Sequence, residues 1–477
     1  MGRRIVFNVS KMGASHVKSG KPCQDYSLSW ESDDKQMQVA IVCDGHGGTS
    51  YVRSDVGSKY AAEIALSNIQ RFTAAVSPAF FLGKSAAVTA RPEEEEDSLF
   101  PTTCKVPHGE LTESQLEQLE QDKAFYAAVA DVREQDEWFC RLFAAIYLQW
   151  LDAIQKDASE HPFTEAEKAC LKNAKVVKAY GSTLMAFVST PFYWFAFHIG
   201  DGKLMACDRN FRWSEPVPWD CNCFLNLTTS LCNSNPIPMF RYAFSGKGDF
   251  PIAVILGSDG LDDSWVTIER LGNFYSQTLA IFDKIGEERA LEELSEYLPE
   301  LSRKASQDDM SMAGIIDMDE IKNGIRVYST QRKINEIQSE KEKKEAELRL
   351  LKTQCEQAEK EIKEQSDKLK GYKTSLLSWF ESILAEKDEK ENDITKQGQD
   401  LDEKRIAHQQ LCHDYDTLYS NYHNWMEHAC QDKEKLERDY DALIQRNAII
   451  EKEALSLWES NKQAFEQQTK AIHEKDQ

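Results

Sequence analysis

The stretch Val39-Ala40-Ile41-Val42-Cys43-Asp44-Gly45-His46-Gly47-Gly48 joins a short apolar run to an acidic residue in a glycine-rich turn. Residues 39–43 are mostly β-branched, which is typical of a buried strand. The same order recurs where Phe192–Ile199 precedes Asp201 and where Ile252–Leu256 precedes Asp259. We therefore expect several strands of one domain to end in acidic turns.

Two further acidic positions fit this arrangement. Asp25 precedes a segment that we interpret as a short strand, and Asp308 precedes the apolar run Met312–Ile316. Carboxylates at strand ends suit hard cations such as Mg²⁺ or Mn²⁺, and two such ions can stabilise an in-line displacement at phosphorus. Any single Asp-Gly pair is more simply a turn. The set as a whole favours a two-metal centre.

These motifs, in this order, resemble those of the metal-dependent protein phosphatases of type 2C, in a bacterial-type variant. The likeness covers about residues 1–320 and rests on the following segments: Gln24-Asp25, Asp44-Gly45-His46-Gly47-Gly48, Gly181-Ser182-Thr183, Gly200-Asp201, Gly257-Ser258-Asp259-Gly260-Leu261-Asp262-Asp263 and Ser306-Gln307-Asp308-Asp309-Met310-Ser311. The last segment has Asp309 where the family has Asn. The resemblance implies an α/β (α+β) fold built as a four-layer α-β-β-α sandwich.

The resemblance also implies an activity and a set of site residues. The activity is hydrolysis of phosphoserine or phosphothreonine on proteins by a metal-activated water, with two Mn²⁺ or Mg²⁺ ions and a weaker third position. His46 would be the general acid. Asp44 would bridge the metals, and the other ligands would be Asp25, the Gly45 carbonyl, Asp259 and Asp308, with Asp201 and Asp263 at the third position.

One departure from the family concerns substrate phosphate. The arginine that family members carry a few residues before the first acidic motif is missing, and residues 16–22 stand in its place. Lys18 or Lys21 could supply a positive charge there, but a lysine does not reproduce the bidentate geometry of a guanidinium. A catalytically weak pseudophosphatase, acting as a coiled-coil scaffold or regulator, is therefore the alternative to an active enzyme.

Composition changes along the chain indicate its organisation. All thirteen prolines lie at or before Pro299, and the sequence after about 320 is rich in Lys, Glu, Gln, Asp and Leu. We expect a phosphatase domain over 1–320, with a mostly helical insertion at about 77–178 and a flap at about 213–244. Residues 77–178 contain a loop with Glu93–Glu96 and two helix-start patterns, at Thr112 and Thr164.

The segment 328–477 is predicted to be a helical coiled-coil tail. Apolar residues recur at alternating spacings of three and four over 348–383 and again over 411–429, whereas this pattern fails around Gly398. A single continuous helix is the simplest structure. Aromatic residues at the repeating positions favour an antiparallel hairpin instead, with a turn near 387–400 and a protein partner for the tail.

Charge and composition limit the classes of partner. The 477 residues contain 57 Lys plus Arg and 80 Asp plus Glu, for a net charge of −23. This acidic balance argues against nucleic acid, which is bound by Lys and Arg. No apolar run is long enough for a membrane span. The start lacks a signal-peptide pattern and the twelve cysteines are irregularly spaced, so we expect reduced thiols, a cytoplasmic protein and an opposing Ser/Thr kinase system.

Overall fold

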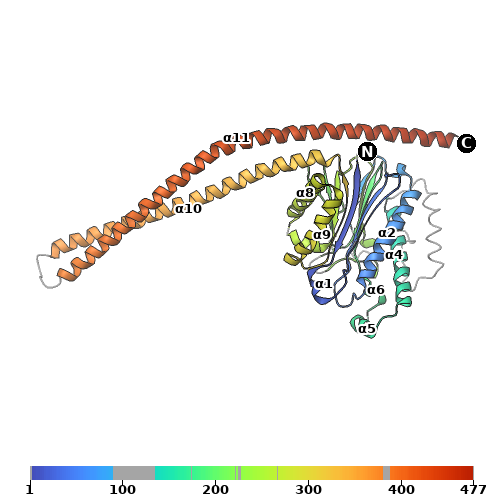
Figure 1. The fold of residues 1–477 in the computed structure, drawn as a ribbon, viewed down its shortest axis with the longest axis horizontal. Helices are drawn as coiled ribbons and strands as arrows, with labels where there is room; N and C mark the ends of the chain where they lie inside the picture. The colour runs from blue at the N-terminus through green and yellow to red at the C-terminus, as the bar shows by residue number, and fades with distance from the viewer. Residues whose placement is uncertain are drawn as a thin grey trace. The chain divides into compact units, whose positions relative to one another are not determined.

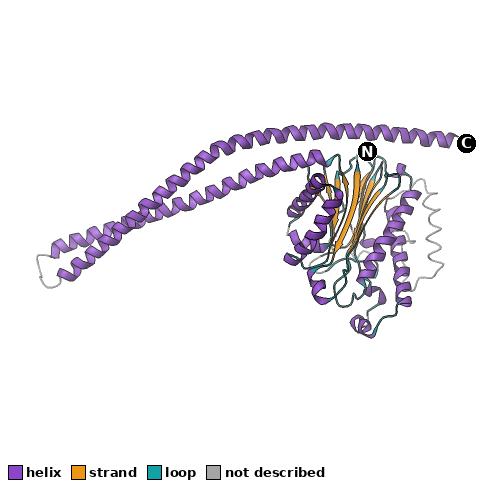
Figure 2. Ribbon diagram, in the orientation of Figure 1, coloured by secondary structure: helices purple, strands orange, loops and turns teal. Residues whose placement is uncertain are grey.

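Two antiparallel β-sheets lie at the centre of the first unit of this computed structural model (Figures 1 and 2). The structure describes residues 3–89, 135–172, 174–220, 222–223, 227–265, 267–379 and 387–475. The chain divides into two units: the first comprises Met1–Tyr328 with Ile444–Gln477, and the second comprises Ser329–Leu443.

Each sheet combines strands that are distant in sequence. In spatial order, the five-stranded sheet contains β1 (Arg4–Lys11), β11 (Met310–Asp317), β10 (Ala253–Gly257), β7 (Lys203–Cys207) and β8 (Trp213–Ser214). The six-stranded sheet contains β2 (Tyr26–Glu31), β3 (Gln38–Cys43), β5 (Leu184–Ser189), β6 (Trp194–Ile199), β9 (Arg241–Ser245) and β4 (Ser85–Val88).

Strand β3 shows why these segments are continuous apolar runs. All six of its residues are buried. Val39, Ile41 and Cys43 face a core shared with helices, whereas Ala40 and Val42 face the core between the two sheets. A strand covered on both faces has no position for a polar side chain, so the alternation typical of a half-exposed strand is absent.

Helices cover the outer face of each sheet. Helices α2 (Ser54–Ala75) and α4 (Gln135–Glu160) pack on the six-stranded sheet, and α8 (Ile268–Ile285) and α9 (Glu287–Lys304) pack on the five-stranded sheet. The predicted four-layer α-β-β-α sandwich is therefore confirmed. The short elements of this unit are α1 (Ala14–Ser19), η1 (Pro78–Phe80), α5 (Glu165–Leu171), α6 (Val176–Ala179), η3 (Ile237–Met239), α7 (Asp259–Asp262) and η4 (Asp263–Trp265).

The segment 77–178 differs from the expected insertion. It supplies β4, which forms the edge of the six-stranded sheet, and α4, whose Phe139, Phe143 and Trp150 are almost fully buried. The indole N–H of Trp150 donates to the Gly57 carbonyl oxygen at 3.0 Å. These residues belong to the main core because α4 presents large apolar side chains to α2 and the sheet. The loop with Glu93–Glu96 and the helix start at Thr112 lie outside the described residues.

Two smaller sequence predictions can be compared with the structure. The helix start at Thr164 is a capping box: the Thr164 hydroxyl accepts from the Glu167 N–H, and the Glu167 carboxylate accepts from the Thr164 N–H. Among the residues that the structure describes, nine cysteines are free thiols. Cys140 is disulfide-bonded, so the expectation of reduced thiols throughout was wrong at that position. Among the helices that the structure describes, none is long and apolar enough to cross a membrane.

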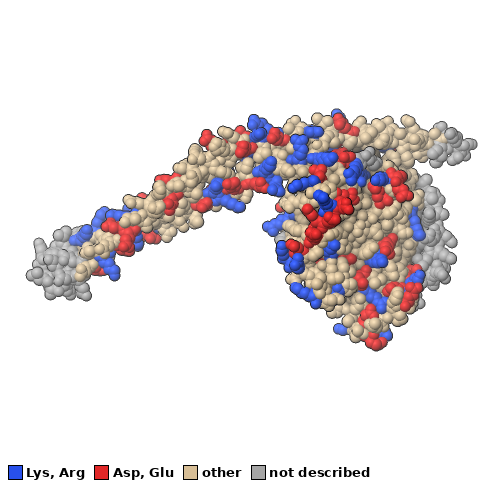
Figure 3. Space-filling model, in the orientation of Figure 1, with Lys and Arg blue, Asp and Glu red and all other residues tan. Residues whose placement is uncertain are grey.

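The second unit is formed by two long helices, α10 (Ile321–Trp379) and α11 (Lys387–Lys475). The Tyr422 hydroxyl donates to the Glu345 carboxylate at 2.8 Å, and the Lys433 ammonium donates to the Gln338 side-chain oxygen at 3.5 Å. Since residue numbers rise along one helix as they fall along the other, the helices are antiparallel. Acidic and basic side chains are interspersed along them (Figure 3), and i,i+4 ion pairs such as Arg332–Glu336 at 2.8 Å support the helices.

The turn expected near 387–400 is not found there. Helix α11 is continuous from Lys387 and passes through Gly398. A glycine costs a helix only about 1 kcal/mol relative to alanine, and the flanking Lys, Glu, Gln and Asp residues include strong helix formers. The loss of apolar periodicity around Gly398 therefore did not indicate a break in the helix.

The last part of α11 belongs to the first unit. The sequence pattern instead predicted that the tail is separate from the phosphatase domain over all of 328–477. The Asn447 side chain is almost fully buried, and its amide donates to the Arg209 carbonyl oxygen at 2.6 Å. Further along, the Phe465 ring lies 4.9 Å from that of Phe192, measured between centroids. These contacts join residues 444–475 to the sandwich because they bury apolar rings and satisfy a buried amide.

We expect spin labels at positions 350 and 419 to lie within roughly 30 Å of each other, since packed helices are separated by 8–10 Å between axes. Leu350 and Tyr419 are exposed, so labels there should not disturb packing. Double electron–electron resonance would measure this distance. A control pair at the exposed positions Ile406 and Ile449 should give about 65 Å along one helix. A value near 100 Å for the 350–419 pair would instead indicate one continuous rod.

Candidate active site

The acidic turns predicted from the sequence come from both sheets. Asp44 follows β3 and Asp201 follows β6, in the six-stranded sheet; Asp259 follows β10 and Asp308 precedes β11, in the five-stranded sheet. The turn 200–202 carries the chain from one sheet to the other, and Gly200 has a φ of 122°, which favours glycine. The sandwich therefore brings together carboxylates that are far apart in sequence.

Asp259 is the common neighbour within this group. Burial, and next the charge of Asp259, raise the pKa of Asp44 well above its ordinary value. The same two causes, in the same order, raise the pKa of Asp201 to about 6 and also raise the pKa of Asp308 and of Asp263. We refer to Asp25, Asp44, Asp201, Asp259, Asp263 and Asp308 as the carboxylate cluster.

Two features of the carboxylate cluster favour the binding of a positive charge. The Asp44 and Asp259 carboxylates interact closely enough for the charge of Asp259 to raise the pKa of Asp44, so their ionised forms repel each other. Asp25 is buried, and its Oδ2 atom has no hydrogen-bond partner. Burial, followed by the charge of Asp309, raises the pKa of Asp25 well above its ordinary value. A shared proton or a bound cation would relieve this repulsion.

The cluster fits a divalent cation by its donor chemistry, because hard cations prefer carboxylate oxygens. Among the residues that the structure describes, no three His, Cys, Asp or Glu side chains are grouped so that they could hold a metal ion as they stand. Rotation of these side chains would therefore have to complete a ligand set on binding.

The turn Asp44–Gly48 is fixed by the strand start at residues 181–183. The Thr183 N–H donates to the Asp44 carbonyl oxygen at 2.8 Å, and the Asp44 N–H donates to the Thr183 hydroxyl at 2.9 Å. A Cβ atom at Gly181 would lie 2.7 Å from the His46 ring and from the Tyr51 ring. Only glycine allows the backbone to approach these rings so closely, which explains the Gly-Ser-Thr motif.

His46 packs edge-on against Tyr51, with ring centroids 4.7 Å apart. Burial lowers the pKa of His46 to about 4; the charge of Asp259 opposes this shift, and that of Lys178 adds to it. This pKa is well below that of an exposed imidazole. His46 is the neutral imidazole at physiological pH.

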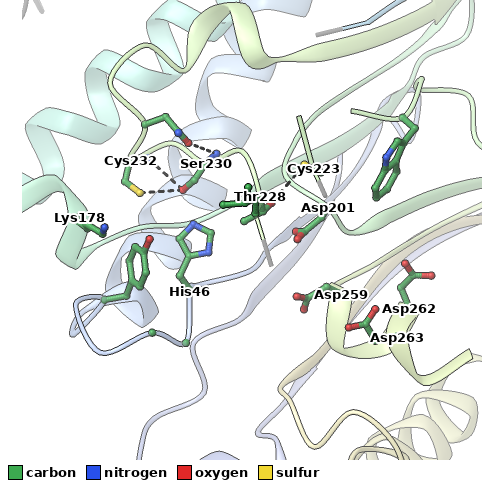
Figure 4. A pocket seen from close by; sticks show the side chains of 16 residues that line it. His46, Lys178, Asp201, Cys223, Thr228, Ser230, Cys232, Asp259, Asp262 and Asp263 are labelled. Atoms are coloured by element: carbon green, nitrogen blue, oxygen red, sulfur yellow. Dashed lines mark hydrogen bonds between the residues drawn. The ribbon is translucent and has the colours of Figure 1, made fainter. Parts of the chain in front are cut away.

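A pocket of about 760 Å³ connects His46 with part of the carboxylate cluster. Figure 4 shows Lys178 and His46 on one side of it and Asp201, Asp259 and Asp263 on the other. Asp262 also lines the pocket, and burial raises its pKa to about 7. The opening is thus acidic at one end and carries a lysine at the other.

The residues that replace the missing arginine are engaged elsewhere. The His16 ring nitrogen Nδ1 lies 2.8 Å from the buried Asp309 carboxylate, which also accepts from the Gly13 and Gln24 N–H groups, both at 2.6 Å. Asp309 therefore holds the loop between β1 and β2. The Lys18 ammonium is 3.4 Å from the Gln307 side-chain oxygen, and the Lys21 ammonium donates to the Gly47 carbonyl oxygen at 2.9 Å. Neither lysine lines the pocket.

The predicted flap at 213–244 includes a buried network and a core strand. Its last residues form β9, which lies between β6 and the edge strand β4 of the six-stranded sheet. The Arg241 guanidinium, 1% exposed, donates to the Gly200 carbonyl oxygen at 2.5 Å and to the Pro218 carbonyl oxygen at 3.0 Å, and lies 3.9 Å from the Asp220 carboxylate. This network supports the turn that carries Asp201. Sequence reasoning did not identify Arg241, Asp220, Asp262 or Lys178.

The sandwich, the acidic turns and the His46 loop that packs against Gly181 are together typical of one class of phosphatase. The model of the family described as protein phosphatase 2C matches residues 12–299, and the chain belongs to that family. No curated protein sequence gives a significant match.

Among solved structures, the chain is similar to a serine/threonine phosphatase from Staphylococcus aureus, with 13% identity, 66% of this chain and 95% of that chain covered, and a TM-score of 0.34. It is similar to the catalytic domain of the serine/threonine phosphatase PstP in complex with two manganese ions, with 15% identity, 66% and 97% coverage and a TM-score of 0.34. The serine/threonine phosphatase of S. agalactiae is 12% identical, with 66% and 99% coverage and a TM-score of 0.34.

Proposed function

We propose that this chain hydrolyses phosphoserine or phosphothreonine on proteins in a reaction that depends on Mn²⁺ or Mg²⁺. The observation that carries the proposal is the buried carboxylate cluster, in which the charge of Asp259 acts on Asp44 and the Asp25 carboxylate has an unpartnered oxygen. Family membership supports the same activity. A bound cation would reduce the repulsion between these carboxylates, so the folded cluster favours cation binding.

The proposed ligands follow from the order of the motifs and from their positions in the sandwich. Asp44 would bridge two cations and the Gly45 carbonyl would complete one ligand set, with Asp25 beside it and Asp259 and Asp308 at the second cation. Asp201 and Asp263 would hold a third, weaker position. When bound, the cations would lower the pKa of water and neutralise charge on the phosphoryl group.

His46 is the proposed proton donor to the departing Ser or Thr oxygen. It lines the pocket, and its ring is fixed against Tyr51. The neutral imidazole must gain a proton before it can act as an acid. A phosphate dianion beside the ring would favour the imidazolium and so raise the His46 pKa.

The expected partners follow from this activity. Phosphoprotein substrates imply an opposing Ser/Thr kinase, and a cytoplasmic location agrees with that role. The second unit, Ser329–Leu443, exposes charged helical surface, and we propose that it binds a protein partner or positions a substrate.

A pseudophosphatase that acts as a scaffold is the alternative function. The described residues contain no group already arranged to hold a metal ion, and the family's phosphate-binding arginine is missing. Both observations would agree with a domain that has lost its chemistry and retains its helical unit for binding.

Turnover of a phosphoserine peptide with and without metal would distinguish the two functions. We expect hydrolysis with Mn²⁺ or Mg²⁺ present and a loss of about a thousandfold or more in excess chelator, since the cations supply several kcal/mol of charge stabilisation. Activity should return when Mn²⁺ is added in excess of the chelator. Absence of turnover with every divalent cation would favour the scaffold, and undiminished turnover in chelator would contradict a metal-dependent mechanism.

A further inference from the structure

A phosphatase of this kind needs a cation that recognises substrate phosphate, and the pocket offers one. Among the described residues that line it, Lys178 is the only lysine, and no arginine lines it. The acidic residues that line it are Asp201, Asp259, Asp262 and Asp263. A phosphate group entering this pocket would therefore meet one permanent positive charge.

Lys178 lies on the His46 side of the pocket (Figure 4). Its ammonium lies 5.6 Å from the centroid of the Tyr51 ring, which packs against His46. An aromatic ring attracts an ammonium without neutralising its charge, so the N–H donors stay available to a ligand.

Within the part of the chain that the structure describes, the Lys178 ammonium has no acidic partner. No described carboxylate lies within ion-pair distance of it, and the side chain is exposed. The other lysines near the site are engaged: Lys21 donates to the Gly47 carbonyl oxygen, and Lys203 lies 3.4 Å from the Glu215 carboxylate. Lys178 thus differs from its neighbours in having a free charge directed at the pocket.

The backbone beneath Lys178 is well fixed. The Arg53 N–H donates to the Ala179 carbonyl oxygen at 2.9 Å, and the Gly181 N–H donates to the Lys178 carbonyl oxygen at 3.3 Å. Ala179 and Tyr180 are fully buried. Lys178 therefore extends from a rigid base, three residues before the glycine that fixes the His46 loop.

We propose that Lys178 binds the phosphate group of the substrate and takes the place of the missing arginine; this inference rests on the proposed phosphatase function. A lysine acts as a point charge on a flexible stem, so it contacts the phosphate in the ground state and in the transition state alike. Loss of such uniform binding raises KM and leaves kcat nearly unchanged.

The test compares Lys178→Ala with Lys175→Ala. Lys175 precedes the same short helix α6, is exposed and does not line the pocket, so this control removes an equal charge from nearby. We expect Lys178→Ala to raise KM for a phosphoserine peptide roughly tenfold, as for loss of a hydrogen bond to a charged group, with kcat within about twofold. Lys178→Arg should restore KM, and Lys175→Ala should match the wild type.

A binding measurement separates failure of this inference from failure of the proposed function. Inorganic phosphate, titrated into the full chain with Mn²⁺ and followed by calorimetry, should bind about tenfold more weakly to Lys178→Ala than to Lys175→Ala. Equal affinities, or equal KM values, would overturn the role of Lys178. If the wild type binds phosphate through Lys178 but hydrolyses no phosphopeptide, the proposed catalysis fails and the binding site stands.

Discussion

Replacement of Asp44 by Asn is expected to abolish metal-dependent phosphatase activity, with a loss of about a thousandfold or more. The charges of Asp259, Asp25 and Asp201 all act on Asp44, which places it among them and makes it the proposed bridging ligand. Removing its charge removes several kcal/mol of metal-assisted stabilisation from the transition state. The measurement is turnover of a phosphoserine peptide at saturating Mn²⁺.

The same substitution should not unfold the protein. Because burial and neighbouring carboxylates raise the pKa of Asp44, its ionised form destabilises the metal-free chain at neutral pH. We expect Asp44→Asn to leave the metal-free melting temperature unchanged or higher, and to remove most of the increase of a few degrees that Mn²⁺ causes in the wild type.

Asp33→Asn is the matched control for Asp44→Asn. Asp33 is exposed and lies in the turn between β2 and β3, at the other end of the strand that carries Asp44. This variant should keep its activity and its metal-induced shift in melting temperature. An Asp44→Asn protein that stays folded and retains a tenth or more of wild-type turnover would contradict the proposed role of Asp44.

Replacement of Arg241 by Met is expected to destabilise the first unit by about 3–5 kcal/mol. The guanidinium is 1% exposed and the Asp220 carboxylate beside it is fully buried, so the substitution leaves an unpaired buried charge and two carbonyl oxygens without their donor. Urea denaturation would measure the change in the free energy of unfolding.

Two comparisons test whether burial causes this effect. Arg303→Met removes a guanidinium that is 64% exposed and lies 3.9 Å from Glu300, and we expect a change below about 1 kcal/mol. Adding Asp220→Asn to Arg241→Met should recover part of the loss, because it removes the unpaired charge. If Arg241→Met cost no more than Arg303→Met, the network would not support the turn at Asp201.

The strands that sequence reasoning identified share one physical property. Segments such as Val39–Cys43 and Ile252–Leu256 are buried on both faces, so their sequences are continuous apolar runs. Strands β7 and β9 were missed because each includes a buried basic residue, Lys203 or Arg241, whose partners come from elsewhere in the chain. A local pattern cannot show that a charged side chain will be paired after folding.

The residues of the candidate site likewise differ in whether the local sequence could predict them. The acidic turns could be predicted because a carboxylate at the end of a strand, followed by glycine, is a local feature. Lys178 could not, since it reaches the pocket only after α6 packs beneath the His46 loop. The low pKa of His46 also depends on burial, which the motif alone does not specify.

Because the carboxylate cluster comes from both sheets, a bound cation would affect the cooperativity of unfolding. Asp44 and Asp201 belong to one sheet, and Asp259 and Asp308 belong to the other. A cation held between them would act as a crosslink across the sandwich, and separation of the sheets would have to release it. Binding and global unfolding would then be thermodynamically linked. A cell depleted of the cation would hold a less active enzyme that is also more easily degraded, so metal supply would control abundance as well as rate.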